Sequence, residues 1–230
     1  MNNILTNSVF FGVLLSLAAY EVGMWLKKKT GWGVCNPLLI SIIITVLVLL
    51  ILHIDYDSYY EGAKYISYLL TPATVCLAIP LYEQVEVLKK NYKAVLIGIV
   101  SGTITSLCTI LVMAVLFGFS HEEYVTFLPK SITTAIGMGV TEELGGYVSI
   151  TVAVIILTGV LGNVIADVVF KIFRIKEPIA RGVALGTASH AIGTAKAMEL
   201  GELEGAMSSL SIVVAGILTV VGASVFSMFY

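Results

Sequence analysis

Three ionisable residues, His190, Lys196 and Glu199, lie within a stretch of mostly small residues, TASHAIGTAKAMELG (Thr187–Gly201). A charged side chain near the middle of a membrane costs about 2.5–3.5 kcal/mol on insertion scales and usually marks a functional position. His190 could carry a coupled proton, since imidazole titrates near neutral pH, or it could be a neutral, hydrogen-bonded residue of a packed hairpin. Lys196 could bind an anionic substrate, or it could pair with Glu143 or Glu199 and stabilise the fold.

This stretch resembles an earlier one, SITTAIGMGVTEELG (Ser131–Gly145). Aligned without gaps, the two copies share Ala-Ile-Gly and Glu-Leu-Gly, and polar Ser and Thr residues precede Ala-Ile-Gly in both. Glycine permits a break in a helix, and the helix N-terminus exposed by a break offers free N–H groups to a carboxylate. The alternatives are a chance similarity, or small residues that only let helices pack while Ser and Thr bond across them.

We predict that both copies contribute to one substrate site. Its candidate residues are hydroxyl, imidazole, glycine and lysine residues: Ser131, Thr133, Thr134, Gly137, Thr187, Ser189, His190, Gly193, Thr194 and Lys196. His190 and Glu143 are the candidates for proton coupling, whereas Lys130 and Arg181 are interpreted as anchors at the membrane interface. The sequence has no nucleophile elbow, phosphate loop, metal-ligand motif or cofactor fingerprint, so we expect no enzyme activity, no metal and no cofactor.

The composition predicts what holds these residues. The chain is 58% hydrophobic and only 12% charged, against about 25% charged residues in a soluble domain. This favours an all-α integral membrane protein that forms a single domain over residues 1–230. Crossing a hydrocarbon core takes about 20 apolar residues, and about six full transmembrane helices are predicted, four of them within residues 1–120: 4–26, 37–54, 63–83, 92–117, 148–173 and 207–229. The net charge of −2 gives no hint of a nucleic-acid partner.

The basic residues predict the topology, because cytoplasmic loops collect Lys and Arg. Clusters at 27–29 and 89–93 place two loops inside. If residues 127–147 crossed the membrane, the basic cluster at 171–181 would lie outside, against the rule. If this segment instead enters and returns, the cluster lies inside, and residues 183–205 can enter from the cytoplasm in the same way.

Two re-entrant segments separated by one span enter from opposite faces. We therefore predict an inverted repeat with units 127–173 and 183–230, an arrangement in which transporters place substrate sites between interrupted helices. A leg of about 8 residues spans about 12 Å, which reaches roughly to the midplane. The alternative is that both segments are broken helices that cross fully.

The stretches "FRIKEPIARGVALGTASHAIGTAKAMELGELEGAMSSLSIV" and "LPKSITTAIGMGVTEELGG" closely resemble the LrgB/CidB family of bacterial membrane proteins. In that family the first copy often contains Thr-Thr-Pro-Ile-Ala. Here Ala135 replaces the proline and Gly137 follows, so a helix break in this copy would depend on glycine. The resemblance implies a multi-pass protein of the bacterial cytoplasmic membrane.

Two functions are implied by the resemblance. One is antiholin-like control of murein hydrolase activity and lysis, as a regulator or pore component beside a small LrgA/CidA-type membrane partner. The other is transport of small monocarboxylates, since a plastid relative moves glycolate and glycerate and bacterial relatives are linked to pyruvate. Because the glycine-containing repeat with its Lys and His suits a solute pathway, we expect a secondary carrier that affects lysis indirectly. A homodimer is expected.

Overall fold

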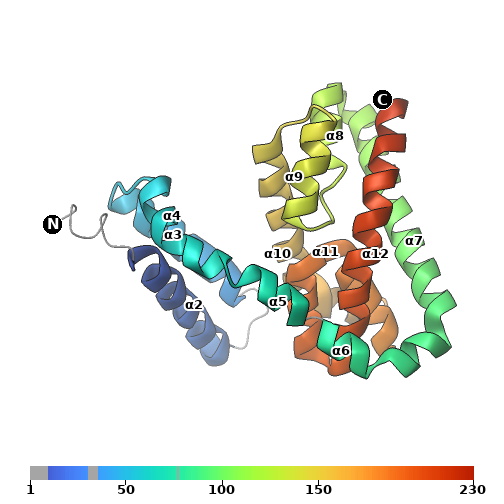
Figure 1. Ribbon diagram of the computed structural model, residues 1–230, viewed down its shortest axis with the longest axis horizontal. Helices are drawn as coiled ribbons and strands as arrows, with labels where there is room; N and C mark the ends of the chain where they lie inside the picture. Colours follow the sequence, from blue (N-terminus) through green and yellow to red (C-terminus); the bar gives the residue numbers. More distant parts are fainter. Residues whose placement is uncertain (1–9, 31–35, 77) are drawn as a thin grey trace. The chain divides into compact units, whose positions relative to one another are not determined.

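Helices form every regular element in the part of the chain that the structure describes, residues 10–30, 36–76 and 78–230. The structure is a computed structural model (Figure 1). The chain divides into two compact units, Met1–Cys76 and Leu77–Tyr230, which are described separately below. The prediction of an all-α protein is confirmed for the described residues.

The first unit is a small antiparallel packing of short helices. Small residues let them approach closely, because an added Cβ at Gly12 would overlap the backbone of α4 and one at Gly23 would overlap Pro37. The Asn36 side chain caps α3 by accepting bonds from the backbone N–H groups of Leu38 and Leu39. Its helices are α2 (Phe11–Thr30), α3 (Pro37–Ile51), α4 (Tyr56–Ser67) and α5 (Leu70–Cys76).

The second unit contains the two sequence copies and is built around three long apolar helices. Its elements are α6 (Ala78–Glu83), α7 (Val85–Phe117), α8 (His121–Phe127), α9 (Thr134–Glu143), α10 (Val148–Ile172), α11 (Pro178–Leu200), α12 (Glu202–Phe226) and the 3-10 turn η1 (Ser227–Phe229). α7, α10 and α12 are the described helices that are long and apolar enough to cross a membrane.

The three long helices coincide with the predicted spans 92–117, 148–173 and 207–229. The span predicted at 37–54 is the 15-residue α3, which is shorter than the roughly 20 residues that a crossing needs. The segment 63–83 is divided among α4, α5 and α6. The span at 4–26 lies partly outside the described residues, and its described part belongs to α2. Six full spans therefore stay a prediction.

The first sequence copy is the inner part of a helical hairpin. Gly118 ends α7 in the left-handed conformation, with φ of 63°, and Ser120 with Glu123 forms a capping box that starts α8. The chain then turns through residues 128–133 and returns as α9. Beyond α9 the chain lies beside α8 again, since the Tyr147 N–H donates to Thr126 Oγ1 over 2.8 Å.

Buried threonines hold this first hairpin against α10. The hydroxyls of Thr141 and Thr151 are 2.8 Å apart, and the Thr151 hydroxyl donates to the Thr126 carbonyl over 2.9 Å. These bonds satisfy polar groups that would otherwise be buried without partners. The end of α8 and the end of α9 are thus both bonded to the start of α10.

α11 is a second hairpin although its residues are almost continuously helical. His190 has φ of 42° and ψ of −134°, a conformation that breaks the helix into two legs. Gly193 on the outgoing leg lies so close to Leu185 on the incoming leg that an added Cβ would overlap the Leu185 carbonyl oxygen. Leu185 and Ala197 belong to one buried cluster. The two legs therefore lie side by side.

The sequence predicts helix breaks at Gly137 and Gly193, but the breaks in the structure lie elsewhere. Gly137 and Gly193 both lie within helical segments, and among the described glycines a left-handed φ occurs at Gly118 and Gly145. The physical reason is that the two repeat glycines provide close approach: an added Cβ at Gly137 would overlap the Ile155 side chain. The helices begin instead after Thr133 and after His190.

The hairpins occupy opposite ends of the second unit. In Figure 1, α8 and α9 lie at the end that holds the C-terminus, and α11 lies in the half that holds α6. Each hairpin is followed by a 25-residue apolar helix, α10 or α12. α12 packs tightly on α11, since an added Cβ at Gly182 or Gly186 would overlap its backbone.

Candidate functional site

The tip of the first hairpin presents a lysine and a serine. Lys130 Nζ donates to Ser131 Oγ over 2.8 Å, and Ser131 Oγ is 3.3 Å from Ser106 Oγ on α7. The Ser131 side chain is buried, with 7% of its surface exposed. This short network places one ammonium group and two hydroxyls where the hairpin tip meets α7.

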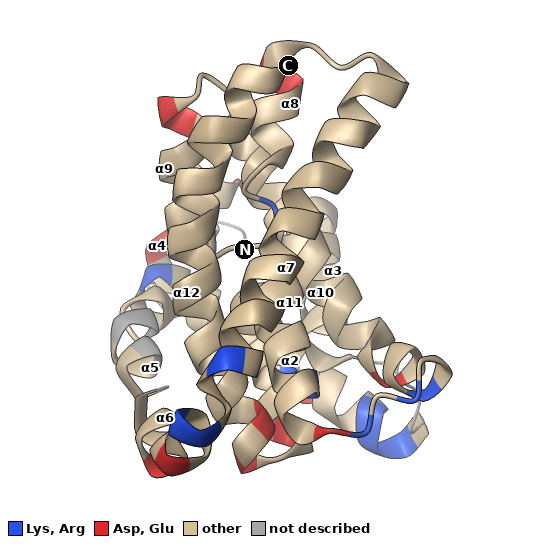
Figure 2. Cartoon of the chain, turned by 90° about the vertical axis from the view of Figure 1, so that its right-hand side faces the viewer, with Lys and Arg blue, Asp and Glu red and all other residues tan. Residues whose placement is uncertain are grey.

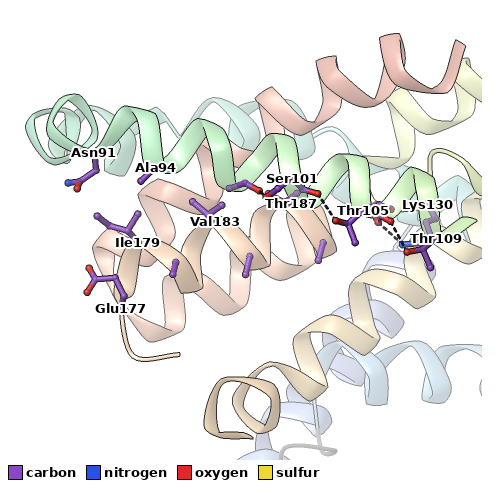
Figure 3. Close-up of a pocket in the computed structure, with 17 residues that line it drawn as sticks. Asn91, Ala94, Ser101, Thr105, Thr109, Lys130, Glu177, Ile179, Val183 and Thr187 are labelled. Atoms are coloured by element: carbon purple, nitrogen blue, oxygen red, sulfur yellow. Dashed lines mark hydrogen bonds between the residues drawn. The ribbon is translucent and has the colours of Figure 1, made fainter. Parts of the chain in front are cut away.

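A groove with a volume of about 770 Å³ extends from this tip along α7 and the incoming leg of α11 (Figure 3). One end lies at Asn91 and Glu177, close to where α7 and α11 begin. Lys130 and Thr109 lie at the other end. The groove therefore connects the ends of α7 and α11 with the tip of the first hairpin.

The α7 wall of the groove is a row of hydroxyls. Ser101, Thr105 and Thr109 are spaced by four residues, so they lie on one face of the helix. The hydroxyls of Thr105 and Thr109 each donate to the carbonyl one turn earlier, over 2.7 Å. Because these hydroxyls have used their protons within α7, their oxygens face the groove mainly as acceptors.

Thr187 is the residue of the α11 wall that carries a hydroxyl, and this hydroxyl is buried without a hydrogen-bond partner. The side chain is 7% exposed, and its methyl group lies beside Gly102 of α7. Within the described residues, the buried side-chain N and O atoms without a hydrogen bond are Thr187 Oγ1 and Thr103 Oγ1. An unpaired buried hydroxyl costs free energy, so a ligand that bonds to Thr187 would remove this cost.

The tip of the second hairpin faces α10 instead. His190 Nε2 lies 3.0 Å from the Ile155 carbonyl oxygen. A carbonyl only accepts, so Nε2 carries the proton of this bond. Thr194 Oγ1 donates to the His190 carbonyl and lies 2.7 Å from Ser208 Oγ on α12. These contacts fix the break between α10 and α12.

The ten predicted site residues do not lie together. Ser131 and Thr187 line the groove. Ser189, His190, Gly193, Thr194 and Gly137 are buried in the hairpin packing, and Thr133 and Thr134 are half-buried at the start of α9. Lys196 Nζ pairs with Asp167 over 2.8 Å and lies 3.9 Å from Glu199. The proton-coupling candidate Glu143 is exposed at the end of α9.

The groove also contains residues that sequence reasoning did not select. Lys130 had been interpreted as an interface anchor, but it lies at the inner end of the groove. The hydroxyl row of α7 is not among the residues predicted for the site. Its signal is visible in the sequence as Ser or Thr at every fourth position from Ser101.

The basic residues of the second unit lie mainly at one of its ends, which also carries acidic residues (Figure 2). Figure 2 shows Lys and Arg gathered at the end that carries α6. The basic residues there come from the start of α7 and from the α10–α11 connection: Lys89, Lys90, Lys93, Lys171, Arg174, Lys176 and Arg181. α8 and α9 carry only acidic charges, namely Glu122, Glu123, Glu142 and Glu143. The predicted clusters at 89–93 and 171–181 thus share one end.

Residues 16–229 match the model of the LrgB-like family. The chain belongs to the LrgB-like family. Antiholin-like protein LrgB of Bacillus cereus (strain B4264) and that of Bacillus anthracis (strain CDC 684 / NRRL 3495) are each 38% identical to it over 225 residues.

The similarity to these LrgB relatives covers 97% of this chain and 98% of each relative. No solved structure matches. The match therefore extends over nearly the whole length of this chain and of each relative.

Proposed function

We propose that the protein is a secondary carrier of small monocarboxylates, of the pyruvate or glycolate type, in the bacterial cytoplasmic membrane. The observation that supports this proposal most is the groove, which ends at Lys130 on a hairpin tip and is walled by the hydroxyls of α7 and Thr187. A cation with nearby hydroxyls suits a small anion. A membrane position makes an ionisable group costly, which favours a functional role for Lys130.

The carrier proposal includes an inverted repeat. Its support is that most of each sequence copy forms the outgoing leg of a helical hairpin, α9 or the second leg of α11, and that an apolar 25-residue helix follows each. Hairpins at opposite ends of the unit (Figure 1) suit entry from opposite faces of the membrane. The units would be 127–173 and 183–230.

Antiholin-like regulation is the second candidate, and it is favoured by the names of the relatives, each an antiholin-like protein LrgB. In this alternative the chain acts with a small LrgA/CidA-type membrane protein on murein hydrolase activity. The carrier proposal accommodates lysis effects as an indirect result of metabolite or proton balance. The two candidates differ in whether the purified chain alone moves a carboxylate.

Counterflow in liposomes tests the proposed function. Purified full-length protein is reconstituted with unlabelled pyruvate inside, and entry of labelled pyruvate, glycolate and sucrose is followed. We expect saturable entry of the carboxylates and none of sucrose. A non-saturable leak of all three solutes would indicate a pore. If no carboxylate moves, and added LrgA/CidA-type protein alone restores an effect on murein hydrolase, the carrier proposal is wrong.

A further inference from the structure

We propose that Lys130 and Thr187 divide the recognition of the substrate, with Lys130 binding the carboxylate and Thr187 selecting acids that carry an oxygen on the neighbouring carbon. This inference rests on the proposed function and assigns its selectivity to two residues. The two residues come from different hairpins, α8–α9 and α11. Both line the same groove.

Lys130 is the groove residue suited to the carboxylate. The other ionisable residue in the lining, Glu177, lies at the opposite end of the groove (Figure 3). Lys130 Nζ donates to the neutral Ser131 hydroxyl, and an ammonium group has three protons to donate. A carboxylate can therefore bind Lys130 without displacing the Ser131 bond. Lys196 is already neutralised by Asp167.

Thr187 is the groove residue suited to a second oxygen. Its hydroxyl is buried and unpaired, whereas Thr105 and Thr109 donate within α7. A hydroxyl can donate to a keto oxygen and can accept from an alcohol. Thr187 can thus bond to both 2-oxo and 2-hydroxy acids, and a simple alkyl acid would leave it unpaired.

The spacing along α7 suits a short acid. Thr187 lies beside Gly102, and Ser131 lies beside Ser106. Four residues of α-helix separate these two positions, which corresponds to about 6 Å. A molecule of three or four heavy atoms, with a hydrogen bond at each end, spans such a distance. Small monocarboxylates with an oxygen on the second carbon meet this requirement.

Equilibrium binding to the full-length protein in detergent tests the assignment. Sodium pyruvate and sodium propionate are titrated calorimetrically at constant ionic strength; both have three carbons, and only pyruvate has the 2-oxygen. We expect the protein to prefer pyruvate by about fivefold to tenfold, the worth of one hydrogen bond. Thr187→Val should abolish this preference by weakening the binding of pyruvate but not of propionate, and Thr187→Ser should retain the preference.

The role of Lys130 in binding the carboxylate is tested with variants in the same titration. Lys130→Met should lower the affinity for both acids at least tenfold, as expected for the loss of a charge-assisted hydrogen bond. Lys196→Met is the matched control, and should leave both affinities within about twofold. If Lys130→Met does not fold, Lys130→Cys in a chain with its three native cysteines changed to serine replaces it. Aminoethyl methanethiosulfonate forms a mixed disulfide with this cysteine and releases methanesulfinate; the attached ammonium group restores a positive charge there and should restore binding.

Three results would overturn the inference: Thr187→Val keeps the pyruvate preference, Lys130→Met binds both acids as the unchanged protein does, or the unchanged protein binds neither acid. Its failure is distinguishable from failure of the carrier proposal. If the protein binds the acids with the expected pattern but moves no carboxylate across liposome membranes, the proposed site is supported and the carrier proposal is wrong. If the protein transports carboxylates and both Thr187→Val and Lys130→Met bind the acids as the unchanged protein does, the carrier proposal is supported and the proposed site is wrong.

Discussion

Single side chains with similar chemistry have different surroundings in this protein. Thr187 and Thr194 both belong to the second sequence copy, and both hydroxyls are buried. Thr194 bonds to the His190 carbonyl and to Ser208, whereas the hydroxyl of the groove residue Thr187 has no hydrogen-bond partner. Hydroxyls between membrane helices contribute about 0.6 kcal/mol on average and up to about 2 kcal/mol. We therefore assign Thr194 to the stability of the hairpin.

Replacing Thr194 with Val should lower stability without changing binding. The Val side chain has nearly the same shape but leaves Ser208 Oγ and the His190 carbonyl with one bond fewer. We expect a loss of about 1 kcal/mol, measured as a lower midpoint of thermal unfolding in detergent, with pyruvate affinity within about twofold of the unchanged protein. An unchanged midpoint together with a tenfold loss of affinity would place Thr194 in the substrate site instead.

Sequence reasoning identified Ser131 and Thr187 but not Lys130. Ser and Thr near a predicted break are recognisable from residue type, because they can satisfy polar backbone in a membrane. Lys130 has the type of an interface anchor, and only the return of the chain after α8 places it in the groove. Lys196 has the type of a substrate ligand, but the 29-residue separation from Asp167 gave no signal of their ion pair.

At the scale of elements, glycines hold the legs of the hairpins together. Gly193 lies against Leu185, where an added Cβ would overlap a backbone oxygen, and no side-chain movement can relieve such a contact. Gly139 on α9 is a natural comparison, since an added Cβ there has nothing within 4 Å. The repeated Ala-Ile-Gly thus serves close packing, and the break itself lies a few residues earlier.

Gly193→Ala should destabilise the protein, and Gly139→Ala should not. Overpacking usually costs about 1–3 kcal/mol, and the rigid backbone contact at Gly193 favours the upper part of this range. At Gly139 the higher helix propensity of Ala should raise the free energy of unfolding by no more than about 1 kcal/mol. The unfolding midpoints of both variants are compared by heating samples in detergent and measuring the remaining folded protein by size-exclusion chromatography. Equal unfolding midpoints would show that the legs of α11 do not pack as described.

Long apolar elements were predictable from sequence, and short ones were not. The three long helices α7, α10 and α12 coincide with predicted spans because some 20 apolar residues have few other stable arrangements in a membrane. The segment 63–83 met the same composition test, yet it is divided among α4, α5 and α6. Hydropathy measures the cost of leaving the membrane and does not locate helix ends, which depend on local capping and packing.

At the scale of the whole chain, the distribution of charge supports the proposed topology. The basic residues of the second unit gather at the α6 end (Figure 2), and α8 and α9 carry acidic residues at the other. The positive-inside rule assigns the basic end to the cytoplasm. α7, α10 and α12 would then cross, while the first hairpin would enter from outside and α11 from inside. The central claim is that these two hairpins enter from opposite faces.

Side-specific cysteine labelling tests this claim most directly. Glu142, at the end of α9, and Glu202, at the start of α12, are exposed. Each is changed to Cys in a chain whose three native cysteines are serine, and cells are treated with a membrane-impermeant maleimide before or after permeabilisation. We predict that Glu142→Cys is labelled in intact cells and Glu202→Cys only after permeabilisation. Labelling of both positions from the same side would contradict the account.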